Sequence, residues 1–142
     1  MKSSKDVLSS IIQTAQMGQI GVRSVLNAPL RTNLKDALRS QLREYDAIER
    51  EALALASGKG WELKDLNPAV KRMSNMMTKM KLAYGDPSSK TAAMMIQGNM
   101  KGIIKGYRDL NQFAAPDERI SSLYRKLLDC EKENIQQMQG FL

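Results

Sequence analysis

The chain has 142 residues, of which 42% are hydrophobic and 26% charged, with 22 Lys and Arg against 15 Asp and Glu. It contains no histidine and a single cysteine, Cys130, which excludes His-activated nucleophiles, histidine zinc sites, disulfide frameworks and four-cysteine zinc sites. The length suits one domain over residues 1–142. No apolar stretch is long enough to span a membrane or to act as a secretory signal, so we expect a cytoplasmic protein.

Apolar residues recur at helical spacing in the first half of the chain. One stripe runs over residues 8–26 and ends at Asn27-Ala28-Pro29. A second stripe, which includes Tyr45, runs over residues 34–55 and stops at Gly58 and Gly60. Spacings that alternate between three and four residues place such side chains on one helix face. The sequence therefore predicts two long helices followed by a connector over residues 59–66.

The second half repeats this pattern after a shorter segment. Asn67-Pro68 is a favourable start for a short helix over residues 67–84, and Gly85-Asp86-Pro87-Ser88 ends it and caps a helix over residues 89–112. Ala115-Pro116-Asp117 then starts a last helix that continues to the C-terminus. Four long helices and a short one predict an all-α, antiparallel four-helix bundle with an extra short crossing helix.

Each long helix also carries polar side chains on or beside its apolar stripe. In chain order these are Gln16, Gln19, Gln41, Glu44, Gln97, Asn99, Glu131 and Asn134. A buried polar group without a partner costs on the order of 1 to 3 kcal/mol, so one polar side chain from each helix is best satisfied in a shared layer at the middle of the bundle. The alternatives are that these residues lie exposed at the edge of the stripes, or that they hold a metal.

With these positions the chain resembles the ferritin-like superfamily, in which each of two helical hairpins carries one Glu and one Glu-x-x-His motif. The motif positions are similar to Glu44-Tyr45-Asp46-Ala47 and Glu131-Lys132-Glu133-Asn134. Gln16 or Gln19 stands for one lone carboxylate, and Gln97 or Asn99 for the other. Among bacterial ferritin-like proteins, the chain looks similar to spore coat F-type and uncharacterised members.

The resemblance implies a degenerate metal site. Ala47 and Asn134 replace the histidines, amides replace the lone carboxylates, and only Glu44 and Glu131 remain as metal ligands. Two carboxylates bind hard cations weakly. We therefore expect no cofactor and a non-enzymatic structural or interaction protein, with a spore association implied by the resemblance. The alternatives are a residual metal-binding oxidoreductase that uses both glutamates, and a Dps-like DNA-binding protein.

Two further patterns concern packing. Methionines cluster on the predicted third and fourth helices, at Met73, Met76, Met77, Met80, Met94, Met95 and Met100. Core packing is the expected role, with contact to a protein partner or another subunit as the alternative. Gly98, Gly102 and Gly106 form a ridge on the fourth helix. Each glycine costs about 1 kcal/mol relative to alanine there, which predicts close approach by the first helix or by a second subunit.

Positive charge is concentrated in residues 71–109, which hold eight basic and two acidic residues. The basic residues are Lys71, Arg72, Lys79, Lys81, Lys90, Lys101, Lys105 and Arg108. A solvated face is the ordinary interpretation of such a surplus. Nucleic acid, an acidic partner and an anionic membrane surface are the alternatives, although interleaved aromatic residues and a phosphate-binding loop are missing.

Overall fold

The computed structural model describes residues 1–63 and 85–142. Four helices account for most of these residues, and the prediction of an all-α four-helix bundle is confirmed. The helices are α1 (Ser4–Val25), α2 (Thr32–Gly58), α4 (Pro87–Asn111) and α5 (Glu118–Gln139). The expected short helix over residues 67–84 lies outside the described residues, as do Met73, Met76, Met77 and Met80 and the basic residues Lys71, Arg72, Lys79 and Lys81.

Short polar side chains begin three of the helices. Ser3 and Asp6 form a reciprocal capping box at the start of α1, Asp86 accepts a hydrogen bond from the Ser88 amide at the start of α4, and Asp117 accepts from the amides at the start of α5. Each cap satisfies backbone N–H groups that have no partner within the helix. These local signals are the reason that the observed starts lie close to the predicted ones.

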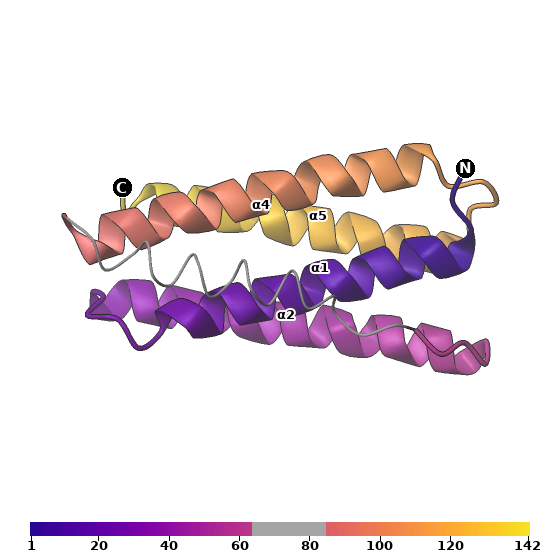
Figure 1. The fold of residues 1–142 in the computed structure, drawn as a ribbon, viewed down its shortest axis with the longest axis horizontal. Helices are drawn as coiled ribbons and strands as arrows, with labels where there is room; N and C mark the ends of the chain where they lie inside the picture. Colours follow the sequence, from indigo (N-terminus) through magenta and orange to yellow (C-terminus); the bar gives the residue numbers. More distant parts are fainter. Residues whose placement is uncertain (64–84) are drawn as a thin grey trace.

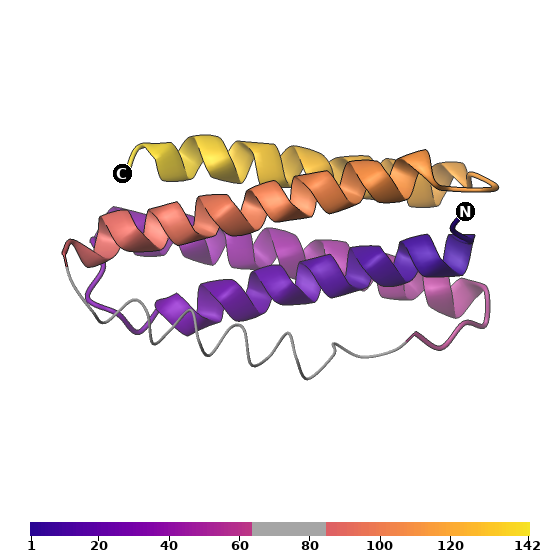
Figure 2. The ribbon, with the colours of Figure 1, turned by 45° about the horizontal axis from the view of Figure 1, so that its top comes forward.

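The helices form two antiparallel hairpins that lie side by side (Figure 1). Helix α1 packs mainly on α2, and α4 packs mainly on α5. Helix α4 begins at the end of the bundle where α2 begins, so these two helices run in the same direction, as do α1 and α5 (Figure 2). Hairpins of this kind bring the middle of all four helices to the same level.

The core consists of two apolar clusters at different levels of the bundle. One lies between the first half of α1, the second half of α2 and the first half of α5. The other lies between the second half of α1, the first half of α2, the start of α4 and the end of α5. On every helix, the residues between the two clusters include buried polar side chains, namely Gln19, Gln41, Asn99, Glu131 and Asn134. A polar layer therefore separates two apolar cores.

One end of the bundle, where α2 and α4 end, is held by contacts between residues that lie far apart in the sequence. Lys2 pairs with the connection between α4 and α5 through backbone hydrogen bonds to Gln112 and Ala114. At the end of α2, the Lys59 ammonium lies 3.2 Å from the carboxylate of Asp117 and 5.3 Å from the ring centre of Trp61. Within the described part of the chain, we find no helix that is both long and apolar enough to cross a membrane.

Candidate functional site

The phenol oxygen of Tyr45 lies at the centre of the polar layer. It lies 2.5 Å from Oε1 of Glu131, 3.2 Å from Oδ1 of Asn99 and 3.4 Å from Nδ2 of Asn134. All four side chains are buried, and they come from α2, α4 and α5. The structure thus brings together three of the residues expected in a polar layer, around a tyrosine expected only as part of an apolar stripe.

The remaining residues of the predicted layer do not reach this centre. Gln19 donates to Glu49 over 3.1 Å, and Gln41 donates to Gln137 over 2.8 Å. Gln16 is half-buried and Gln97 is exposed on α4. Gln97 faces solvent because it stands about 200° around the helix from Asn99, so one helix cannot direct both side chains inward.

The Glu131 carboxyl is the most strongly perturbed acid of the layer. Burial raises its pKa to about 7, while the hydrogen bond from Tyr45 acts in the opposite direction. Burial raises the pKa because the charged form loses more hydration than the neutral form when it leaves water. Glu131 is therefore a carboxyl that gains and loses its proton near neutral pH.

Glu44 lies in a different environment from Glu131. Burial and the nearby charge of Glu133 raise its pKa, against a hydrogen bond with Cys130. Burial also raises the pKa of the Cys130 thiol to about 11, so the thiol stays protonated and unreactive at neutral pH. Across residues 1–63 and 85–142, no three Asp, Glu or Cys side chains lie close enough together to share a metal ion.

The glycines of α4 have unequal surroundings. A Cβ atom added at Gly102 would lie 2.8 Å from Oε2 of Glu131, and one at Gly106 would lie 2.5 Å from Leu128, whereas one at Gly98 would meet nothing within 4 Å. Close approach therefore occurs at two of the three positions, mainly to α5 rather than to α1. It occurs there because α4 pairs with α5 as a hairpin.

A second polar cluster surrounds Asp109, which is 1% exposed. Its carboxylate lies 2.5 Å from the Lys2 ammonium, 3.4 Å from the Lys105 ammonium and 2.5 Å from the hydroxyl of Tyr124. Burial alone would raise the pKa of Asp109, but the hydrogen bonds from Lys2 and Tyr124 and the charge of Lys105 hold it below its usual value. The carboxylate is thus a fixed anion inside a basic region.

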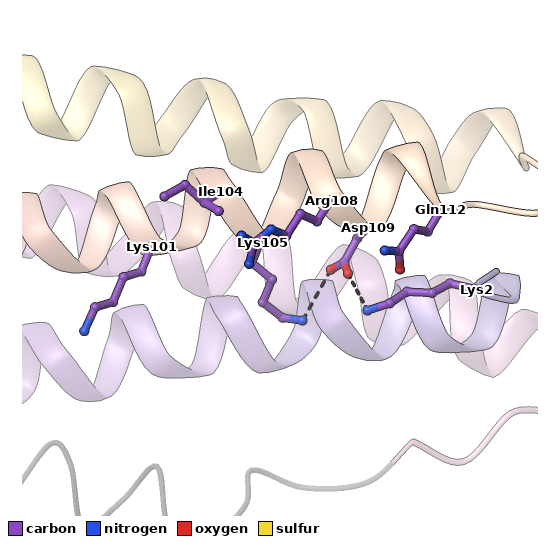
Figure 3. A pocket seen from close by; sticks show the side chains of 7 residues that line it. All are labelled: Lys2, Lys101, Ile104, Lys105, Arg108, Asp109 and Gln112. Atoms are coloured by element: carbon purple, nitrogen blue, oxygen red, sulfur yellow. Dashed lines mark hydrogen bonds and ion pairs between the residues drawn. The ribbon is translucent and has the colours of Figure 1, made fainter.

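This cluster forms one end of a groove along α4 (Figure 3). The groove is lined by Lys2, Lys101, Ile104, Lys105, Arg108, Asp109 and Gln112. The Asp109 carboxylate lies between the ammonium groups of Lys2 and Lys105 (Figure 3). Lys101 and Arg108 have no ion-pair partner within the described part of the chain, and Lys2 and Lys105 share the single charge of Asp109. The four cations of the groove thus exceed its one carboxylate by three positive charges.

Apolar side chains are exposed beside this groove. Met100, Ile104 and Tyr107 are 52%, 50% and 45% exposed, and their spacing places them on one edge of α4. Tyr107 accepts a hydrogen bond from the Lys132 ammonium over 2.6 Å. We call the set Met100, Lys101, Ile104, Lys105, Tyr107 and Arg108 the α4 face; it combines an apolar edge with a basic edge.

Two of the central residues were not predicted from the sequence. Tyr45 was assigned to an apolar stripe, although a buried tyrosine hydroxyl needs a partner and the polar residues at its level could have supplied one. Asp109 continues the buried spacing Ala92, Met95, Asn99, Gly106 on α4. Its position on that face, as one of two acids in a basic segment, is the signal that could have identified it.

Replacement of Asp109 by Asn should destabilise the bundle. The amide keeps the shape but leaves Lys2 and Lys105 without their counter-charge and places N–H groups against other donors, at a cost of about 2–3 kcal/mol. Thermal unfolding near neutral pH measures this loss. Asp36→Asn is the matched control, because Asp36 makes an exposed ion pair with Arg39 and its loss should leave the melting temperature unchanged. Equal effects of the two substitutions would contradict the role given to Asp109.

Comparisons with known proteins bear on the fold alone. No protein-family profile matches the chain, and no curated protein sequence matches it. Among solved structures, the chain is similar to the crystal structure of a DUF305 fragment from Deinococcus radiodurans, with a TM-score of 0.77 and 12% sequence identity. The match covers 96% of this chain and 93% of that one.

The expectation of a ferritin-like protein with a degenerate metal site was therefore wrong. The fold is that of the DUF305 fragment, and no ferritin-like relative was found. The pattern was misleading because polar side chains at the middle of each helix can satisfy one another by hydrogen bonds, without a metal ion. The position compared with one histidine, Ala47, is exposed on α2.

Proposed function

We propose that the chain is a non-enzymatic interaction protein that binds an acidic, amphipathic protein helix on the α4 face. The observation that carries this proposal is the exposure of Met100, Ile104 and Tyr107 along an edge of the same helix that presents Lys101 and Arg108. Apolar and acidic side chains on one partner helix would cover both edges at once.

The character of the α4 face favours an acidic protein over other partners. Nucleic acid is held mainly by cations placed on successive phosphates, and here the ammonium groups of Lys2 and Lys105 are both directed at the buried Asp109 carboxylate. A second copy of the chain would bring like charges together at the same face. An acidic helix instead pairs with Lys101 and Arg108 and buries the exposed apolar edge.

The interior supports a binding role over a catalytic one. Glu131, Tyr45, Asn99 and Asn134 are engaged with one another rather than with a substrate cavity. A buried polar network whose hydrogen bonds are satisfied favours one packing of the helices. On this proposal the bundle is a rigid support that presents the α4 face.

The test is binding of a synthetic helical peptide built from Leu and Glu, measured by fluorescence anisotropy. The Lys101→Glu, Arg108→Glu double variant and the Ile104→Glu variant should each bind at least about tenfold more weakly than the unmodified chain. The control is Arg23→Glu, Arg43→Glu, which makes the same change of net charge at exposed positions on α1 and α2.

Specific outcomes would overturn the proposal. Equal weakening in the control variant would mean that net charge, not the α4 face, drives binding. Tighter binding of double-stranded DNA than of the peptide, lost in the Lys101→Glu, Arg108→Glu variant, would identify nucleic acid as the partner. Equal binding of a peptide with Lys in place of Glu would remove the requirement for an acidic partner.

A further inference from the structure

With the Asn99 amide oriented as in the structure, the hydrogen bonds around Tyr45 cannot all be satisfied when Glu131 is ionised. A phenol donates one hydrogen and accepts at two lone pairs. In the structure, both Oε1 of Glu131 and Oδ1 of Asn99 lie within hydrogen-bond distance of the Tyr45 oxygen. A carboxylate and an amide carbonyl are both acceptors, so they compete for the same hydrogen. One of the two then remains without a donor in a buried site, which is costly.

Protonation of Glu131 removes this conflict. The neutral carboxyl donates its hydrogen to the Tyr45 oxygen, and Tyr45 donates to Oδ1 of Asn99. Nδ2 of Asn134 donates to the second lone pair of Tyr45. Every donor and acceptor position of the phenol is then used, with the side chains where the structure places them.

The ionised state is satisfied by a different arrangement. Tyr45 donates to the Glu131 carboxylate. The Asn99 side-chain amide rotates by about 180°, which exchanges its Oδ1 and Nδ2 atoms, so that Nδ2 donates to Tyr45. Oxygen and nitrogen of an amide occupy nearly equivalent positions, so the rotation needs little space. As placed, Nδ2 of Asn99 is buried and has no hydrogen-bond partner within the described residues, so the rotation breaks no bond there.

We propose that Glu131, Tyr45 and Asn99 form a proton-binding switch at the centre of the bundle. Uptake of one proton by Glu131 reverses the direction of its hydrogen bond with Tyr45 and sets the orientation of the Asn99 side-chain amide. The proton moves onto the carboxylate from solvent, and no other bond is made or broken. The switch joins α5 to α2 and α4, and it does not depend on the partner proposed above.

The surroundings of Glu131 place the switch near neutral pH. Its titratable neighbours are Tyr45 on α2 and Tyr124 and Cys130 on α5, all of which burial keeps protonated. Uncharged Gly102 of α4 lies next to the carboxyl, with Thr14 of α1 on the same side, and uncharged Asn99 of α4 shares the Tyr45 hydroxyl with it. Burial therefore dominates, and it raises the pKa of Glu131 to about 7.

Gly102 gives the carboxylate the space that it needs. Oε2 of Glu131 lies 2.8 Å from the point where a Cβ atom of residue 102 would stand. Gly102 is itself half-buried rather than enclosed. The carboxylate therefore lies against a partly exposed residue of α4 that has no side chain.

Nuclear magnetic resonance tests the switch directly. The Glu131 carboxyl carbon and the Asn99 side-chain amide are followed from about pH 5 to about pH 9. Both should titrate with one shared midpoint near 7. In the Glu131→Gln variant the Asn99 amide should become independent of pH. In Tyr45→Phe, Glu131 should titrate at higher pH, while the Asn99 amide no longer follows it.

Two results would overturn the switch. A Glu131 midpoint near 4.5, the ordinary value, would mean that no proton is held at neutral pH. A constant Asn99 amide beside a titrating Glu131 would mean that proton uptake is not linked to the amide. The Glu131→Gln arm keeps the test decisive if Tyr45→Phe does not fold, because an uncharged amide of the same size is tolerated at a buried position.

Discussion

Gly18→Ala should lower the free energy of unfolding by about 2–4 kcal/mol, although alanine favours helix by about 1 kcal/mol. The added Cβ atom would lie 2.6 Å from two ring carbons of Tyr45. That ring cannot retreat freely, because Tyr45 is buried and its hydroxyl is held by Glu131. Thermal or urea unfolding measures the change, and the melting temperature should fall by roughly 10 °C.

Gly21→Ala is the matched control on the same helix. Its added Cβ atom would meet nothing within 4 Å, so only the helix preference acts and stability should rise by up to about 1 kcal/mol. Opposite signs for two Gly-to-Ala substitutions three residues apart would isolate the contact with Tyr45. If both variants gained stability, the close packing of α1 against Tyr45 would be refuted.

Glu131→Gln should stabilise the bundle at high pH and make little difference at low pH. The folded pKa of Glu131, about 7, is above the ordinary value of 4.5. Stability from this group is therefore fully present below about pH 4.5 and is lost as pH rises through about 7, a total of about 3 kcal/mol. The variant lacks this loss, so its advantage near pH 8 should approach that amount.

The measurement is urea unfolding of both proteins at about pH 5 and about pH 8. Asp129→Asn is the control, since it removes one exposed carboxylate from the same helix and should leave the difference between the two pH values unchanged. A variant that is less stable than the unmodified chain at both pH values would show that the Glu131 charge is needed rather than tolerated. An equal gain in the free energy of unfolding at both pH values would show that the effect does not come from titration of Glu131.

Local patterns were sufficient to predict the helices. Apolar spacing and the caps at Asp86 and Asp117 are determined within a few residues of each helix end, so the predicted boundaries of α4 and α5 fall close to the observed ones. The same spacing placed Glu131 and Asn134 on the apolar stripe of α5, and both are buried. On α4 it offered both Gln97 and Asn99, of which only Asn99 is buried. These inferences need no knowledge of how the helices are arranged in space.

The partners of the buried groups could not be predicted in this way. Which helix faces Gly106, or which side chain reaches Asn99, depends on the rotation and pairing of whole helices. The sequence offered α1 as the contact for the glycine ridge, and the structure places Leu128 and Tyr124 of α5 there. The prediction of a family failed for a different reason, because buried polar side chains that satisfy one another do not by themselves identify a family.

The division of the bundle into two hairpins also determines the expected order of folding. Contacts between α1 and α2 and between α4 and α5 are close along the chain and form early, whereas Tyr45 meets Asn99 and Glu131 only when the hairpins dock. Tyr45→Phe, which removes only the hydroxyl, should therefore change the unfolding rate more than the folding rate. The lifetime of the folded chain, more than the speed of its formation, would then depend on the hydrogen bonds of one phenol.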